Sequence, residues 1–395
     1  MDKTADDLLT DLNPDRKGQP FLYASTTNTL TADIYSSTSL KKTVSVGDEN
    51  SYSDGQLNNL PKNVYENGFY TYKVRLRNAD ASSNDNIIFY DKLDGYVPSR
   101  DTDDYGDFRW RGKFVSIDLS ELEKAGIKPV VYYSTKENIV VDNMDNRSDN
   151  DLTKSNIWTK TRPTDKRITA IAVDARHKAD GSDFELGVNK SISFTIKMQA
   201  PQLSKDDDAI LDPQLKTGDN LKNVYDGLIS VTESESGITG GAHAYNSIAM
   251  TFVSISNKDK VRTGNMLIKN EYTKVGLKKL NISVKKSWDD DNDRDGLRPK
   301  TLSFDLFDSK VGYSKSNALD SVTVNKDFKW SGDFDRYSTP LDRNGNPIDF
   351  EIKETNKPNG YTFSVTKDKT TDSLVFKAVN KHKPEKISLR GVKTW

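Results

Sequence analysis

The sequence predicts an all-β protein, because short runs in which apolar and polar residues alternate recur along most of its length. Clusters of Asp, Asn, Gly and Ser separate these runs, as turns separate the strands of antiparallel sandwiches. The only credible helix is short, at 119–126, where Ser120 and Glu123 have capping-box spacing and Gly126 is placed to end it. We therefore expect elongated, tandem, immunoglobulin-like β-sandwiches.

The strand pattern divides the 395 residues into a large and a small domain. The alternation is clearest in 70–77, 86–93, 191–198 and 303–307. We expect a flexible lead at 1–20, a large N-terminal sandwich of one domain or two subdomains at 21–276, and a smaller sandwich at 277–384. Segments 280–288 and 387–395 align as an internal repeat, so 385–395 is expected to be the first strand of a following module in a longer protein.

Composition excludes several classes of function. The 58 basic and 59 acidic residues balance, which argues against a nucleic-acid partner. No stretch approaches 18 consecutive apolar residues, so no membrane insertion is expected. The absence of cysteine removes disulfides and thiolate sites, and the three histidines lack ligand spacing. We expect no cofactor and, without a nucleophile elbow or a phosphate-binding loop, no enzyme.

Three polar residues of the smaller domain fall on the inward face of their strands. Alternation turns Lys286 inward with its apolar neighbours in 282–288, Glu354 in 350–354 and Asn380 in 376–380. A buried lysine and a buried carboxyl are costly unless they are paired or neutralised. One interpretation is an ion pair with the asparagine as hydrogen-bond partner. The other is a self-formed Lys–Asn isopeptide bond, in which Glu354 assists as a protonated acid.

Several ordered motifs of this domain carry a family resemblance. They are 284–290, 292–299, 352–354, 360–362 and 379–382. Together they resemble the collagen-adhesin B-type (Cna B-type) repeat of Gram-positive surface proteins, and the resemblance covers nearly all of 280–384. It implies a stalk spacer with an isopeptide bond between Lys286 and Asn380, assisted by the acid Glu354.

Three patches of the large domain also place a lysine, an acid and an asparagine on inward strand faces. Lys42, Asp91 and Asn270 each share an inward strand face with apolar residues. These patches look like the isopeptide-forming domains of Gram-positive pilins and adhesins. The resemblance implies a bond between Lys42 and Asn270, assisted by Asp91. The alternative is a surface lysine pair, a turn-forming aspartate and a strand-end asparagine.

The acidic loop 289–296 is a weak candidate for calcium. Asp291, Asp293 and Asp295 have the spacing that opens an EF-hand loop. Leu302 occupies the position that requires a bidentate glutamate, and no helix pattern flanks the loop. A solvated turn is the favoured interpretation.

These features predict an extracellular fragment of an adhesin attached to a Gram-positive cell wall through regions outside this chain. The N-terminal domain would bind a host matrix or cell-surface ligand, with Trp110, Trp158 and the pair Tyr132–Tyr133 as candidate contacts, although each is more typical of a core. The small domain would be its stalk. The alternative is a purely structural stalk or pilus shaft without ligand binding.

Overall fold

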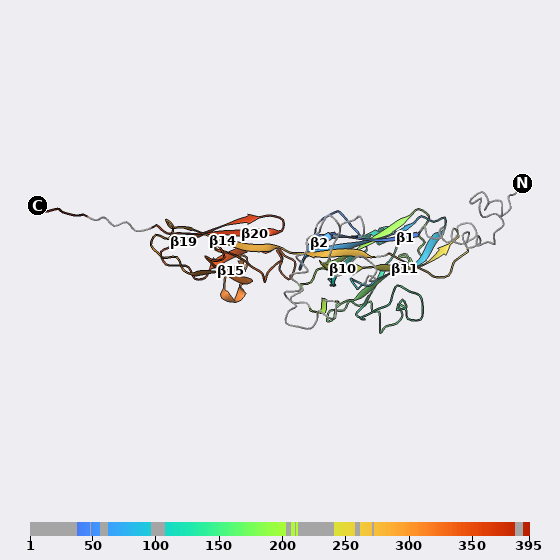
Figure 1. Cartoon of the computed structure of the whole chain (residues 1–395). Coiled ribbons are helices and arrows are strands. Elements are labelled where there is room, and N and C mark those ends of the chain that lie inside the picture. The colour runs from blue at the N-terminus through green and yellow to red at the C-terminus, as the bar shows by residue number, and fades with distance from the viewer. Residues whose placement is uncertain are drawn as a thin grey trace, which may run out of the picture.

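The structure is a computed structural model that describes residues 38–47, 49–55, 62–95, 107–202, 207–209, 211, 241–256, 261–270, 272–383 and 390–395. The expected lead at 1–20 lies outside these ranges. The described strands form two β-sandwich bodies that lie end to end (Figure 1). The predicted all-β, tandem-sandwich class is confirmed.

The short helix exists, but its predicted capping box is wrong. Within the described ranges, α3 (Ser120–Lys124) is the one α-helix. Its N-cap is Leu119 without a side-chain cap, and Ser120 instead donates its backbone N–H to Asp118 Oδ1 at 2.9 Å. The helix starts one residue earlier than a Ser120 cap requires, and Asp118 takes over the side-chain contact at its start. Gly126 follows with φ of +86°, a conformation suited to glycine.

The described strands of the N-terminal body, residues 38–278, form three sheets. The first has the order β1-β3-β9-β6, the second β2-β13-β10-β5 and the third β12-β11-β4-β8-β7. Their strands are β1 (Thr38–Val46), β2 (Lys62–Tyr65), β3 (Phe69–Asn78), β4 (Ser83–Asp91), β5 (Asp107–Arg109), β6 (Lys113–Asp118), β7 (Val130–Ser134), β8 (Ala170–Asp174), β9 (Ser191–Gln199), β10 (Gly241–Asn246), β11 (Ile248–Ile255), β12 (Met266–Lys269) and β13 (Thr273–Lys278).

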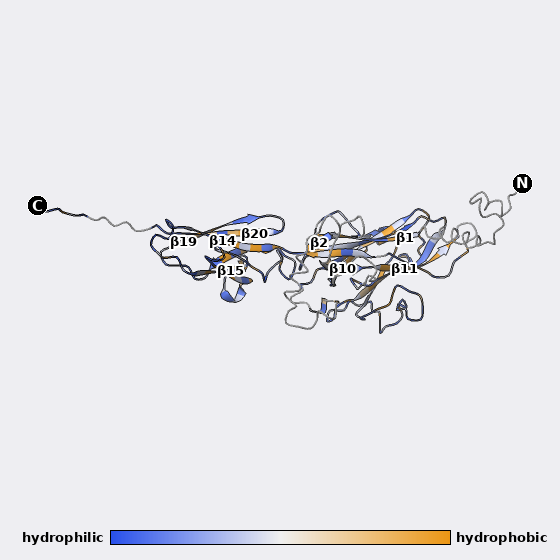
Figure 2. Ribbon diagram, viewed as in Figure 1, coloured by the Kyte–Doolittle hydropathy of each residue, from blue (hydrophilic) through white to orange (hydrophobic). Residues whose placement is uncertain are grey.

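The first and third sheets share one core because alternate residues of their strands are apolar. In β3 the buried residues include Val74 and Leu76, and in β9 they include Ile196 and Met198. Phe89 of β4 packs edge-on against Phe194, with ring centroids 5.1 Å apart. Figure 2 shows the resulting change between hydrophobic and hydrophilic residues along the strands.

The long segment between β7 and β8 covers the outer face of the third sheet. A second hydrophobic cluster forms there from β4, β8 and this segment. Its buried members are Ile88, Tyr90, Ile139, Val141, Trp158, Ala170 and Ala172. Strands covered on both sides are apolar on both faces, which explains why all five residues of β8 are buried.

The C-terminal body, residues 281–381, is a two-sheet sandwich with orders β17-β14-β20-β19 and β16-β15-β18. Its first strand, β14, and its last, β20, pair in parallel. The strands are β14 (Asn281–Asp289), β15 (Thr301–Asp308), β16 (Asp320–Asn325), β17 (Ser331–Asp333), β18 (Phe350–Glu354), β19 (Thr362–Lys369) and β20 (Ser373–Lys381).

Only Lys279 and Leu280 separate the last strand of one body from the first strand of the next. Leu280 is buried in the C-terminal core. Across the junction, Tyr65 donates its hydroxyl to the Thr371 carbonyl at 2.8 Å, and Thr339 donates to the Glu66 carbonyl at 2.6 Å. These contacts couple the two bodies along their common long direction.

The strand expected at 385–395 is absent where the structure describes that segment. Residues 390–395 have no secondary structure, and Val392 and Trp395 are exposed. Residues 384–389 lie outside the described ranges. A strand needs a hydrogen-bonded partner to be stable, and no described strand pairs with 390–395.

Candidate functional site

The first candidate site lies in the N-terminal body, where three strands bring polar side chains into the core. Lys42 comes from β1, Asp91 from the end of β4 and Asn246 from the end of β10. Each is at most 1% exposed. The Lys42 ammonium nitrogen, Nζ, donates hydrogen bonds to Asp91 Oδ2 and to Asn246 Oδ1. Strand register explains the meeting, because Asp91 pairs with Ile248, two residues after Asn246.

Burial sets the electrostatics of this site. It lowers the pKa of Lys42, although the charge of Asp91 opposes the shift. It raises the pKa of Asp91, and there the charge of Lys42 opposes the shift. The ring centroid of Tyr72 lies 4.4 Å from Lys42 Nζ and helps to exclude water. Burial therefore shifts both groups toward their neutral forms.

Asn246 takes the place that the sequence analysis gave to Asn270. Asn270 follows the edge strand β12, and its Oδ1 accepts the backbone N–H of Ile248 at 2.7 Å. It is half-buried and is not among the hydrogen-bond partners of Lys42. β12 is the edge strand of the third sheet, and β11 separates it from β4, which carries Asp91. The available signal for Asn246 was its alternation with Ala244 and Ile248.

The second candidate site lies in the C-terminal body. Lys286 of β14, Glu354 of β18 and Asn380 of β20 are 6%, 6% and 0% exposed, so their predicted inward direction is confirmed. Asn380 Nδ2 donates to Glu354 Oε1 at 2.7 Å. Asn380 Oδ1 and Glu354 Oε2 are buried without a hydrogen-bond partner.

Lys286 approaches this pair without a hydrogen bond to it. Its Nζ lies 3.8 Å from the ring centroid of Trp288 and donates to the backbone carbonyl of Ser287. Burial lowers the pKa of Lys286 to about 8, against the opposing charge of Glu354. Burial also raises the pKa of Glu354. The site thus holds the same chemical groups as the first, with the lysine turned toward the indole.

The calcium candidates do not converge. Among the described residues, no three carboxylate, histidine or cysteine side chains form a group that could hold a metal ion. Asp293 Oδ1 accepts the backbone N–H of Arg298, and Asp295 Oδ2 lies 2.9 Å from His382 Nε2. Asp291 contacts Arg294 at 3.3 Å. Protein contacts hold the loop in this conformation, and calcium binding there stays a prediction.

The aromatic residues proposed as a ligand surface are mostly core. Trp110 and Trp158 are 0% and 3% exposed. Trp158 donates its indole N–H to the Asp149 carbonyl at 2.6 Å. Tyr132 and Tyr133 are partly buried against the two N-terminal clusters. Burial follows from the apolar area of these rings, which is large enough to anchor a core.

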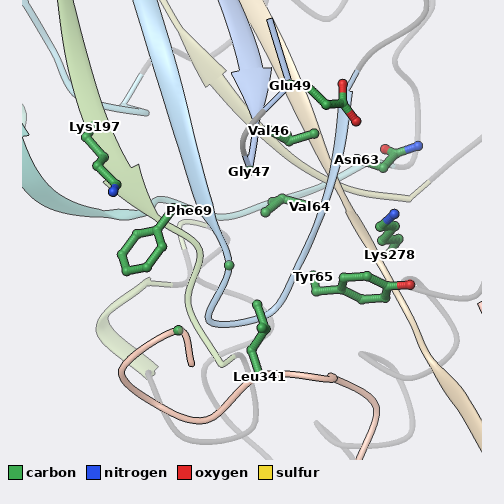
Figure 3. Close-up of a pocket in the computed structure, with 12 residues that line it drawn as sticks. Val46, Gly47, Glu49, Asn63, Val64, Tyr65, Phe69, Lys197, Lys278 and Leu341 are labelled. Carbon is green, nitrogen blue, oxygen red and sulfur yellow. The ribbon is translucent and has the colours of Figure 1, made fainter. Parts of the chain in front are cut away.

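A pocket of about 420 Å³ opens at the junction between the bodies (Figure 3). The N-terminal body contributes the aromatic residues Tyr65 and Phe69, and Leu341 belongs to the C-terminal body. Lys278 Nζ lies 4.4 Å from the Tyr65 ring centroid, and Lys197 Nζ lies 4.4 Å from that of Phe69. The pocket therefore combines apolar walls with two cations, Lys197 and Lys278, and one carboxylate, Glu49. No helix in the described part of the chain has the length and apolarity to cross a bilayer.

Comparison with known proteins places one family in this chain. Residues 282–377 match the family model of the Cna protein B-type domain. A collagen adhesin of Staphylococcus aureus is 29% identical over 130 residues, which are 32% of this chain and 10% of that protein. The chain thus spans about a tenth of the length of this curated relative.

Two solved structures are similar at low identity. A single B repeat unit of the collagen-binding surface protein of Staphylococcus aureus is 17% identical, with a TM-score of 0.22, over 34% of this chain and 80% of that one. The major pilin subunit of Bacillus cereus is 13% identical, with a TM-score of 0.33, over 88% of this chain and 71% of that one. The residues that match the Cna protein B-type domain, 282–377, lie within the sandwich formed by β14 to β20.

Proposed function

We propose that the chain is a load-bearing part of a Gram-positive cell-surface adhesin or pilin-like protein. In this proposal each sandwich is locked by a self-formed isopeptide bond, Lys42–Asn246 in the N-terminal body and Lys286–Asn380 in the C-terminal body. The observation that carries it is the burial of one lysine, one acid and one asparagine together in each body. The B-type domain match supports an extracellular place on the cell wall.

The chemistry requires only groups present at the site. Asp91 gives its proton to the carbonyl oxygen of Asn246 while the neutral Lys42 amine attacks the amide carbon. Asp91 then carries a proton from the attacking nitrogen to the amide nitrogen of Asn246. The bond from the amide carbon to its original nitrogen breaks, ammonia leaves, and the proton on the oxygen returns to Asp91 as the carbonyl re-forms, which regenerates the acid. Glu354 has the corresponding role for Lys286 and Asn380. Each site acts once, so this is no enzyme with turnover.

Intact mass under denaturing conditions tests the proposal. Each bond removes one ammonia, about 17 Da, so the chain should be about 34 Da lighter than its sequence. Lys42→Ala and Lys286→Ala should each abolish one of the two losses. Their outward neighbours provide matched controls, and Lys41→Ala and Lys285→Ala should keep both. Asn246→Ala should abolish the first loss and Asn270→Ala should not. A full sequence mass in the unaltered chain would refute the proposal.

Ligand binding is the second part of the proposal. With the candidate tryptophans buried, the junction pocket offers the combination of aromatic walls and cations that suits an acidic host matrix or cell-surface ligand. Binding of the whole chain to collagen, other matrix proteins and acidic glycans tests this by biolayer interferometry. Lys278→Ala should weaken binding at least about fivefold, and its neighbour Lys279→Ala should not. Absence of binding across the panel would favour the alternative, a purely structural stalk or pilus shaft.

A further inference from the structure

A second carboxylate lies buried beside the first site and has no role in the chemistry described above. Asp94, three residues after Asp91, is 0% exposed. Its Oδ1 accepts the Tyr72 hydroxyl at 2.6 Å, and its Oδ2 accepts the Tyr70 hydroxyl and the Gly112 backbone N–H at 2.9 Å. Burial and the charge of Asp94 raise the pKa of both tyrosines, so they remain donors.

Asp94 also contacts the amide that the proposed reaction consumes. Asn246 Nδ2 donates to Asp94 Oδ1 at 3.2 Å, while Asn246 Oδ1 accepts from Lys42. An amide has one acceptor end and one donor end. With the lysine nitrogen on one side and a carboxylate on the other, only this orientation of the amide satisfies both partners. Reversal would place its N–H groups against the lysine donor.

The backbone of Asp94 indicates that this placement is specific. Its φ is +54°, in the left-handed region that a residue other than glycine enters at a cost. Four neutral donors surround its carboxylate: two hydroxyls, one backbone amide and the amide of Asn246. A side chain that only filled this space would need none of these hydrogen-bond donors. These four hydrogen bonds fix the orientation of the Asp94 carboxylate.

We propose that Asp94 is a positioning residue for the Lys42–Asn246 bond. It holds the amide nitrogen of Asn246, so that the amide carbon stays presented to Lys42, and it receives the ammonia as it leaves. This inference rests on the proposed function, because it concerns the same reaction. Asp94 itself neither gains nor loses a covalent bond, and the proton balance remains with Asp91.

The rate of bond formation tests this inference in the full chain. The protein is synthesised in a cell-free system, samples are quenched in acid and urea, and peptides cross-linked at Lys42–Asn246 are quantified by mass spectrometry. The Lys286–Asn380 cross-link in the same samples serves as an internal control. Asp94→Asn should slow the first bond at least about tenfold and leave the second unchanged, because a misoriented amide loses the benefit of a fixed approach.

An exchange of the two side chains separates positioning from mere structural support. Asn246→Asp alone places two carboxyls together, so cross-linking should be slow. Combining Asn246→Asp with Asp94→Asn restores one acid and one amide, and cross-linking should become faster than in Asn246→Asp. The product then loses water, about 18 Da, in place of ammonia, about 17 Da. A structural role alone predicts no such rescue.

The outcomes distinguish a failure of the proposed function from a failure of the inference about Asp94. No cross-linked peptide in the unaltered chain would refute the proposed function and this inference with it. An unaltered chain that cross-links, beside an Asp94→Asn chain with the same rate, would overturn the inference alone. Unfolding of Lys42→Ala with and without Asp94→Asn measures the effect on folding in the absence of any bond. If Asp94→Asn fails to fold there, the exchanged pair decides, and a folded exchanged chain without rescue overturns the inference.

Discussion

The two bodies bury the same three kinds of side chain but arrange them differently. In the N-terminal body Lys42 touches both its acid and its asparagine. In the C-terminal body Glu354 and Asn380 bond to each other, while Lys286 lies over the Trp288 ring. The difference shows that strand alternation decides which side chains enter a core but not which neighbours a buried lysine contacts, since both lysines also lie beside an aromatic ring.

The bodies also differ in how much chain the proposed bonds enclose. Lys286–Asn380 joins β14 to β20, the first and last strands of the C-terminal body. Lys42–Asn246 joins β1 to β10 and leaves β11, β12 and β13 outside the closed loop. A force applied along the chain would therefore be carried by the covalent bond across nearly all of the C-terminal body but across only part of the N-terminal body. We call the first arrangement a complete lock and the second a partial lock.

The largest expected effect is the difference between Lys42→Ala and Lys286→Ala in the free energy of unfolding that each variant loses. Loss of either bond removes about 5 kcal/mol in the chain-entropy model. Lys42→Ala also leaves the buried Asp91 without its hydrogen-bond partner, which costs about 1–3 kcal/mol more. Denaturant unfolding followed by tryptophan fluorescence measures both, since Trp110 and Trp158 report on the N-terminal body and Trp288 and Trp330 on the C-terminal one.

Lys41→Ala and Lys285→Ala are the matched controls for that comparison, because these neighbours point outward. Equal losses for Lys42→Ala and Lys286→Ala would show that the direct contact of Lys42 with Asp91 adds nothing to stability.

Single-molecule stretching should distinguish the partial from the complete lock. In the unaltered chain, the N-terminal body can release only the segment after Asn246, about 30 residues or roughly 100 Å. The C-terminal body should release almost nothing. Lys42→Ala should lengthen the first step to roughly 800 Å. A first step below about 30 Å would instead place the bond at Asn270.

The sequence predicted the sandwich class and most of both sites because alternation is a local property. Lys42, Asp91, Lys286, Glu354 and Asn380 all face inward as their strand patterns indicate. Their chemical roles stay predictions until the mass is measured.

The choice between Asn246 and Asn270 depended on which late strand ends beside β4, and strand order is a long-range property. Asp94 was missed because it follows a strand in a turn and has no periodic signal. The inward tyrosines Tyr70 and Tyr72 were the available clue, since buried hydroxyls need acceptors.

Substitutions of two glycines, one in each body, test the comparison further, with smaller expected changes in the free energy of unfolding. A Cβ on Gly112 would lie 1.9 Å from the Tyr70 hydroxyl, which Asp94 holds in place. A Cβ on Gly332 would meet Val322 Cγ2 at 2.6 Å, at the end of a side chain that can turn. Gly112→Ala should lower the free energy of unfolding by about 1–3 kcal/mol, and Gly332→Ala by less than about 1 kcal/mol. Comparable losses would mean that the Tyr70 hydroxyl bound to Asp94 can be displaced as easily as a valine side chain.

The last comparison is a pH dependence specific to Lys286. Asn380→Ala prevents the bond and leaves Lys286 free to titrate. Its pKa is about 8 in the folded body, against an ordinary value of 10.5. Between these values the unfolded chain binds more protons than the folded one, so stability should rise with pH above about 8, by up to about 1.4 kcal/mol per pH unit. Below pH 8 this contribution is flat, because both states carry the proton.

The matched control for this titration is Asn380→Ala combined with Lys286→Met, which keeps the aliphatic chain and removes the amine. Its stability should lack the rise between pH 8 and 9.5 in the Trp288 and Trp330 signal. A rise of equal size in the control would assign the dependence to other groups. A flat profile in Asn380→Ala itself would mean that Lys286 reaches water when the bond is absent. In that case the contact with Trp288, and not burial, would govern its position.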